Sequence, residues 1–116
     1  MAQVVPAERD LRRVIGDGEA IPDGEVDGLG ADDLLGLYRD MVVLRTYDER
    51  SLVYHRQGRI GTYAIFWGHE AMQVDAARAL ADDDWIFPSY RESAIGLLRG
   101  MPAATVLSWW RGHPEG

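Results

Sequence analysis

The sequence predicts an α-rich domain of four helical segments with at most one short strand. Its 116 residues allow one domain at most. With 47% hydrophobic and 27% charged residues, the composition is ordinary for a globular protein that buries a modest core. Apolar residues recur at spacings of three and four over most of the chain, and only Ile86-Phe87 is expected to be extended.

Residues 1–30 are predicted to form an extended or mobile N-terminal arm. They show little hydrophobic periodicity and are dense in turn-forming residues, as in Gly16-Asp17-Gly18 and Pro22-Asp23-Gly24. The domain itself is therefore predicted over residues 31–116.

A long helix is predicted from Asp32 to Gln57. Asp32 and Asp33 suit the positive end of the helix dipole, and Gly58 can adopt the left-handed conformation that ends a helix. The apolar face of this helix favours core or subunit packing over a dedicated partner-binding surface. This face comprises Leu34, Leu37, Tyr38, Met41, Leu44, Tyr47 and Tyr54.

Residues 59–67 are predicted to form a loop rich in glycine and aromatic residues. Tyr63, Phe66 and Trp67 could line a pocket or fill a core, and both alternatives stay open. Gly68 should cap a second helix. Its small residues predict a tightly packed, buried face, made of Ala71, Ala76, Ala77, Ala79 and Ala81.

His69 falls in the first turn of the predicted second helix. An imidazole at this position can donate a hydrogen bond to a substrate carboxylate or carbonyl. A structural histidine with its hydrogen bonds satisfied inside the protein is the alternative, and the sequence leaves both open.

The stretch that follows Asp82-Asp83-Asp84 predicts a proline-broken entry into a third helix. Pro88 keeps Phe87 out of the α region, so a helix can resume only after it. Ser89 is then a good N-cap, and Glu92 three residues later completes a capping box.

Tyr90 and Arg91 would lie in the first turn of this third helix. The unpaired backbone N–H groups of such a turn, together with a guanidinium and a phenol hydroxyl, suit a phosphate group. The alternative for Arg91 is a surface salt bridge with Glu92, with Glu70 or with an aspartate of the run 82–84.

The third helix is predicted to continue to Leu98 and to end at Gly100. Pro102 suits the first position of a fourth helix that runs to Gly112. The adjacent Trp109 and Trp110 favour a place in the core or an interface over base stacking, because no basic surface surrounds them.

Charge and composition exclude several function classes. A net charge of −7 argues against a nucleic-acid surface, and no apolar run is long enough to span a membrane. The absence of cysteine excludes disulfides and thiolate metal sites and fits a cytoplasmic location. No export leader is recognisable.

Three segments, in this order and at this spacing, carry a family resemblance: Gln57–Tyr63, Gly68–Val74 and Trp85–Ser93. From about Leu34 to Pro114 the chain resembles the alpha subunit of the thiamine-diphosphate-dependent first component (E1) of 2-oxo acid dehydrogenase complexes. Both the pyruvate and the branched-chain members have such segments. The resemblance identifies the chain as an N-terminal fragment of such a subunit.

The resemblance implies an α/β thiamine-diphosphate-binding parent fold, whose sheet and magnesium ligands lie beyond this chain. It implies a 2-oxo acid substrate, an E1 beta subunit in a heterotetramer, and acyl transfer to the lipoyl domain of E2, with the fragment alone inactive. Gly16-Asp17-Gly18 is similar to the magnesium motif of these enzymes, but the chain has no asparagine to complete it, so a turn is favoured.

The resemblance also implies site residues. Tyr90 and Arg91 match the pair that contacts the cofactor diphosphate, and Ser89 occupies a neighbouring contact position. Tyr63 is expected near bound substrate, with His69 as a polar orienting residue. No catalytic residue is assigned, since the activating glutamate of this family belongs to the beta subunit and Ser93 stands where many relatives have histidine.

The sequence leaves alternatives open for the substrate and for the functional class. Residues 58–63 are most similar to pyruvate-type sequences, whereas His69 recurs in branched-chain enzymes. A helical interaction module without catalysis is the competing class, in which the aromatic faces bind a partner and the stretch around Pro88 is only a capped turn.

Overall fold

The computed structural model describes residues 28–114, and the chain divides into two units, 1–30 and 31–116. The Gly16-Asp17-Gly18 turn and most of the predicted arm lie outside the described residues. The second unit contains four helices, α1 (Ala31–Arg56), α2 (Glu70–Ala79), α3 (Ala94–Leu98) and α4 (Ala103–Trp110). Residues 31–114 contain no strand, so this part of the chain is mostly helical, as predicted.

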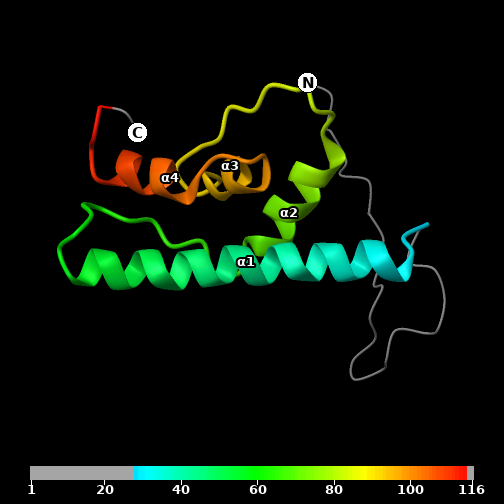
Figure 1. Ribbon diagram of the computed structural model, residues 1–116, viewed down its shortest axis with the longest axis horizontal. Coiled ribbons are helices and arrows are strands. Elements are labelled where there is room, and N and C mark those ends of the chain that lie inside the picture. Colours follow the sequence, from blue (N-terminus) through cyan, green and yellow to red (C-terminus); the bar gives the residue numbers. More distant parts are fainter. Residues whose placement is uncertain (1–27, 115–116) are drawn as a thin grey trace, which may run out of the picture. The chain divides into compact units, whose positions relative to one another are not determined.

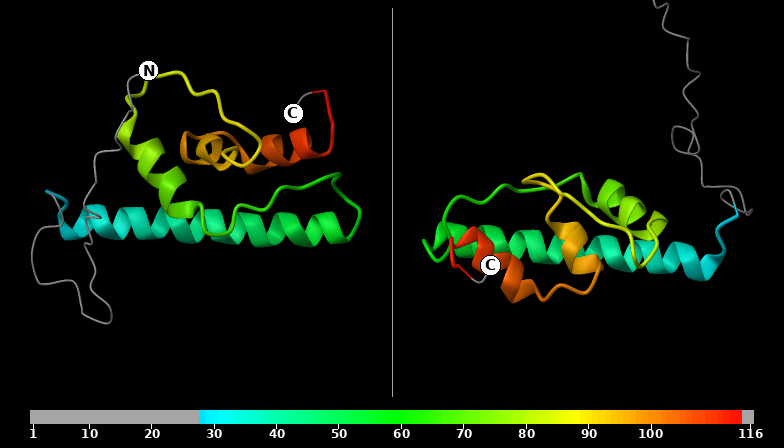
Figure 2. Two further views of the ribbon diagram at one scale, coloured as in Figure 1. Left: turned by 180° about the vertical axis from the view of Figure 1, so that it is seen from behind. Right: turned by 90° about the horizontal axis from the view of Figure 1, so that it is seen from above.

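The second unit is built on α1. Figures 1 and 2 show α1 as a long straight base, with α2 leaving it obliquely and α3 and α4 following on the same side. Helix α2 packs against both α1 and α3, and α3 contacts α4. A backbone hydrogen bond of 3.2 Å from Gly61 to the Trp110 carbonyl ties the loop after α1 to the end of α4.

Helix α1 lies within one residue of its predicted bounds at each end. It ends as predicted, because Gly58 has a φ of 69° and the Arg59 amide returns to the Tyr54 carbonyl at 2.9 Å. His55 has a structural contact here, since its Nδ1 donates to the Gly61 carbonyl at 2.6 Å. The turn therefore directs the chain back along α1.

The core lies where α1, α2, α3 and the loop 59–69 meet. Leu44, Phe66, Val74 and Ala94 form one buried cluster, and each is at most 1% exposed. Tyr47 stacks on Phe66 with ring centroids 6.4 Å apart and an interplanar angle of 14°. Burial of these apolar side chains supplies the main driving force for folding of this unit.

The predicted alanine face of α2 is wrong except at Ala77. Ala71, Ala76 and Ala79 are exposed, and the buried residues are Glu70, Gln73, Val74 and Ala77. The reason is that the two polar side chains find tertiary hydrogen-bond partners, so the face that carries them can be buried. The helix begins at Glu70, with His69 as its N-cap, after Gly68 at a φ of 86°.

The predicted start of the third helix is also wrong. Helix α3 begins at Ala94, and its N-cap Ser93 makes no side-chain capping bond, so Ser89 and Glu92 do not form a capping box. Tertiary contacts hold the preceding segment out of helix, because the Arg91 carbonyl accepts a 3.1 Å bond from Gln73 Nε2. Tyr90 therefore lies in no helical turn.

The ends of the last two helices agree more closely with the sequence. Gly100, with a φ of 87°, follows α3, and Gly112, with a φ of 75°, follows α4. Pro102 is the N-cap of α4, one position before the place predicted for it. No helix within residues 28–114 has the length and apolar character needed to cross a membrane.

Candidate functional site

The segment between α2 and α3 is extended and carries exposed rings. Trp85 and Phe87 are 83% and 86% exposed, and their rings stack with centroids 6.3 Å apart. Pro88 follows them, and Tyr90 further along is 57% exposed. The predicted phosphate-binding residues therefore stand on an open segment instead of a helix N-terminus.

Arg91 is half-buried and is anchored from two sides. Its Nη1 donates to the Ile65 carbonyl, and its guanidinium lies 5.2 Å from the centroid of the Tyr90 ring. Within residues 28–114 no carboxylate pairs with this guanidinium, so the alternative of a salt bridge with Glu70 or Glu92 is not realised there. Since a guanidinium has five N–H donors, the others remain available to a ligand.

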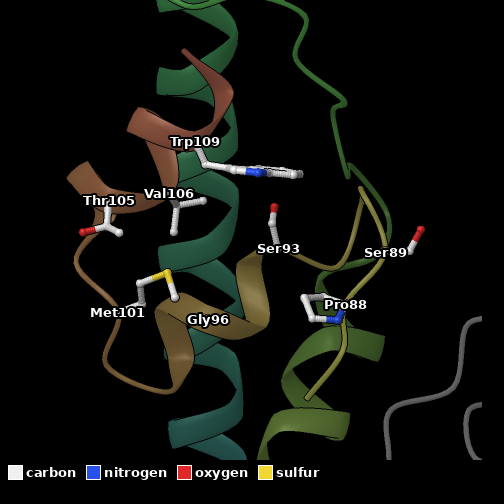
Figure 3. A pocket seen from close by; sticks show the side chains of 8 residues that line it. All are labelled: Pro88, Ser89, Ser93, Gly96, Met101, Thr105, Val106 and Trp109. Carbon is white, nitrogen blue, oxygen red and sulfur yellow. The ribbon is translucent and has the colours of Figure 1, made fainter. Parts of the chain in front are cut away.

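Ser89 lines a mostly apolar cavity of about 250 Å³ between the extended segment, α3 and α4. Figure 3 shows the Trp109 ring at one end, with the Ser93 hydroxyl directed toward it and the Ser89 hydroxyl pointing away. The full lining is Pro88, Ser89, Ser93, Gly96, Met101, Thr105, Val106 and Trp109. Tyr90 and Arg91 lie outside this lining, so the cavity is beside the predicted diphosphate residues.

Tyr63 points inward. It is 9% exposed, its hydroxyl donates to Asp48 Oδ1 at 2.7 Å, and its ring meets Trp110 edge-on at 5.2 Å. Burial and the bond to Asp48 raise the pKa of the Tyr63 hydroxyl above its ordinary value. Of the two alternatives that the sequence left open for Tyr63, this geometry is core filling. Contact of Tyr63 with substrate stays a prediction.

Asp48 is a residue that the sequence analysis missed. It is fully buried on α1, its Oδ1 also accepts a 3.3 Å bond from the Phe66 amide, and burial raises its pKa. The signal was present, because Asp48 and Ser51 continue the apolar spacing of Met41 and Leu44 along α1, and both are 0% exposed.

His69 lies at the N-cap of α2 with φ −99° and ψ 0°. Its main chain is satisfied, since the amide donates to the Phe66 carbonyl at 2.9 Å and the carbonyl accepts from Gln73 at 3.1 Å. Its Nδ1 is buried and has no hydrogen-bond partner within residues 28–114. The side chain thus holds a buried polar atom for which the described residues provide no partner.

Glu70 has a structural role. Its Oε1 accepts from Arg45 Nε at 2.6 Å, and its Oε2 accepts from the Gly68 amide at 2.9 Å. The bond from Arg45 is the main reason that the pKa of Glu70 is lowered. The pair joins the start of α2 to α1, and the Arg45 guanidinium also lies 5.6 Å from the Trp67 ring centroid.

The Glu70 contacts predict a dependence of stability on pH. A carboxyl whose pKa is lowered by folding stabilises the protein above its unfolded pKa, and this contribution is lost as pH falls through the folded pKa. Glu70→Gln should therefore lose about 1 kcal/mol at pH 7 and lose less than the parent on acidification. Urea unfolding between pH 3 and pH 7 measures both.

Asp75→Asn is the control, because Asp75 is an exposed carboxyl on the same helix, α2. It should change the unfolding midpoint little. If Glu70→Gln loses as much stability on acidification as the parent, the stabilising role of the ionised carboxylate is contradicted.

The structure brings three of the predicted site segments together. The bond from Arg91 to Ile65 places residues 89–91 against the loop 59–69, and the bond from Gln73 joins α2 to the same point. Ser89, Tyr90 and Arg91 are accessible or half-buried, whereas Tyr63 is committed to the core. No group of three or more metal-ligating side chains occurs within the described part of the chain.

Comparisons with known proteins agree on one family. A family model described as "Dehydrogenase E1 component" matches residues 38–116. The chain is 43% identical over 88 residues to "3-methyl-2-oxobutanoate dehydrogenase subunit alpha" of Mycobacterium tuberculosis, covering 76% of this chain and 24% of that protein. It is 36% identical over 99 residues to "Pyruvate dehydrogenase E1 component subunit alpha" of Bacillus subtilis, covering 85% and 27%.

The "Pyruvate dehydrogenase E1 component subunit alpha" of Acholeplasma laidlawii is 40% identical over 88 residues, which cover 76% of this chain and 26% of that protein. The chain thus spans about a quarter of the length of the curated relatives it matches. No solved structure matches it significantly.

Proposed function

Because the chain belongs to the dehydrogenase E1 component family, we propose that it is the N-terminal part of the alpha subunit of a thiamine-diphosphate-dependent 2-oxo acid dehydrogenase. The observation that carries the proposal is the family match over residues 38–116, which includes all three motif segments and the site around Arg91. The parent fold in this proposal is α/β. The exposed, extended segment 85–88 supports this, since a parent sheet can take it up as a strand.

The side chains around Arg91 fit the diphosphate of the cofactor. Arg91 keeps free N–H donors beside the exposed Tyr90, and Ser89 adds a hydroxyl on the same open segment. The fit rests on these side chains alone, because α3 begins three residues after Arg91 and offers no helical N–H groups there. Magnesium ligands are expected from residues beyond this chain.

Thiamine diphosphate, when bound, supplies the carbanion chemistry of decarboxylation. The residues of this chain would bind the cofactor and orient the substrate. Arg91 and Tyr90 would hold the diphosphate, and the half-buried imidazole of His69 at the start of α2 would orient the substrate. In the proposed cytoplasmic enzyme, an E1 beta subunit completes the site and the lipoyl domain of E2 receives the acyl group.

The proposed substrate is a 2-oxo acid, with pyruvate first and a branched-chain 2-oxo acid second. Residues 58–63 support pyruvate, and several relatives are named pyruvate dehydrogenase. The relative with 43% identity is named for a branched-chain 2-oxo acid. An assay of the assembled complex with both acids separates the two, because the true substrate should give the higher kcat/KM.

A cofactor titration tests the proposed function. The chain is purified with a 2-oxo acid dehydrogenase beta subunit, and thiamine diphosphate is added in the presence of Mg²⁺. Binding should be saturable and tighter than that of thiamine, because only the diphosphate reaches Arg91. A helical interaction module predicts equal, negligible response to both compounds, and that result would remove the cofactor proposal.

A further inference from the structure

Asp48 holds the loop after α1 at two points through a single oxygen. Its Oδ1 accepts from the Tyr63 hydroxyl at 2.7 Å and from the Phe66 amide at 3.3 Å. The two donors are three residues apart in the loop 59–69, and the carboxyl that receives them is fully buried. The middle of the loop is therefore fastened to α1 by one side chain.

One of the two residues between these points carries the contact to Arg91. Ile65 precedes Phe66, and its carbonyl accepts the hydrogen bond from Arg91 Nη1. A displacement of the loop would move this carbonyl and with it the guanidinium. The position of the predicted diphosphate residue thus depends on Asp48, although the two side chains are not in contact.

The second oxygen of the carboxyl takes no part in the fastening. Asp48 Oδ2 is buried and has no hydrogen-bond partner within residues 28–114. Both donors meet at Oδ1, and an amide oxygen at the same place can accept both bonds. Burial raises the pKa of Asp48, and the hydrogen bonds from Tyr63 and from the Phe66 amide act in the opposite direction.

We propose that Asp48 is the positioning residue that fixes the loop 59–69 and, through the Ile65 carbonyl, the guanidinium of Arg91. Any effect of Asp48 on cofactor binding rests on the proposed function. The positioning of the loop does not depend on that function, because it involves only contacts within this chain.

Amide hydrogen exchange at Phe66 in the full 116-residue chain measures the fastening directly. Asp48→Ala should lower the protection factor of this amide about tenfold or more, since its acceptor is removed. Asp48→Asn should retain the protection within about threefold, because an amide oxygen still accepts both bonds. Glu49→Gln, an exposed neighbour on α1, should change nothing.

Two further readouts separate positioning from simple support of the fold. Tyr63→Phe removes one of the two tethers and should lower Phe66 protection severalfold, which keeps the test valid if Asp48→Ala does not fold. The parent should lose protection as pH rises through the folded pKa of Asp48, because a raised pKa favours folding at lower pH, and Asp48→Asn should not. The titratable groups around Asp48 are Tyr47 and Arg45 on α1, Tyr63 on the loop and Glu70 on α2.

Equal loss of protection in Asp48→Asn and Asp48→Ala would overturn the role of the Asp48 acceptor oxygen. Unchanged protection in Tyr63→Phe would overturn the two-point fastening. A thiamine diphosphate titration of Asp48→Asn and Tyr63→Phe, run beside the parent, reports on the proposed function separately. Failure of the parent to bind cofactor leaves the exchange results standing.

Discussion

Phe66→Ala is expected to lower the free energy of unfolding by about 3–5 kcal/mol. Phe66 is 1% exposed and is the largest fully buried side chain of the described residues. It belongs to one buried cluster with Leu44, Val74 and Ala94 and stacks on Tyr47, so alanine at position 66 leaves a cavity among these side chains. Small domains unfold with about 5–15 kcal/mol in total, so a loss of this size is measurable by urea unfolding.

Phe87→Ala is the control, because it makes the same chemical change at a residue that is 86% exposed. Its effect should stay below about 0.5 kcal/mol. If Phe66→Ala leaves too little folded protein to measure, Phe66→Leu should show a smaller loss in the same direction. Equal losses at positions 66 and 87 would contradict the placement of the core.

Arg91→Ala is expected to weaken thiamine diphosphate binding to the complex with the beta subunit by on the order of 2–4 kcal/mol. The reason is that the guanidinium would form two charge-assisted hydrogen bonds to the diphosphate through N–H groups not used by Ile65. Isothermal titration of parent and variant gives the difference directly. Arg91→Lys should recover only part of the loss, because an ammonium group lacks the planar fork.

Arg111→Ala serves as the matched control, since Arg111 is an exposed arginine at the C-cap of α4. Its removal should leave cofactor affinity unchanged. Circular dichroism must show that Arg91→Ala remains folded, because this variant also loses the bond to the Ile65 carbonyl. Equal affinity of parent and Arg91→Ala would remove Arg91 from the site.

The sequence predicted the parts of the fold that depend on local pattern. Helix α1 has a long apolar repeat and a glycine stop at Gly58, and both its ends lie within one residue of the prediction. Gly100 and Pro102 likewise mark the boundary between α3 and α4. These signals act over a few residues, so the sequence contains all that is needed to read them.

The errors arose where distant contacts decide the structure. Ser89 and Glu92 have the spacing of a capping box, but bonds from Gln73 and to Ile65 hold Arg91 in a non-helical conformation. Asp48 was missed because a carboxyl is usually exposed, and its burial depends on donors from a loop 15 and 18 residues away. Only the folded arrangement brings such partners together.

The sequence predicts the site as a set of residues but not as an arrangement. The motif segments suggest Ser89, Tyr90, Arg91, Tyr63 and His69, and their roles stay predictions. The structure brings their segments together but gives the side chains different surroundings, with Tyr63 turned toward Asp48 in the core and Tyr90 exposed on the extended segment. Side-chain direction in loops depends on tertiary packing, which a motif does not encode.

The exposed indole of Trp85 gives this chain a built-in optical probe. At 83% exposure the ring is surrounded by water, so its fluorescence should emit at long wavelength. Any chain that covers the segment 85–88 would shift this emission to the blue and shield it from iodide quenching. With Trp67, Trp109 and Trp110 replaced by phenylalanine, assembly with the proposed beta subunit should therefore be visible in the emission of Trp85 without an attached dye.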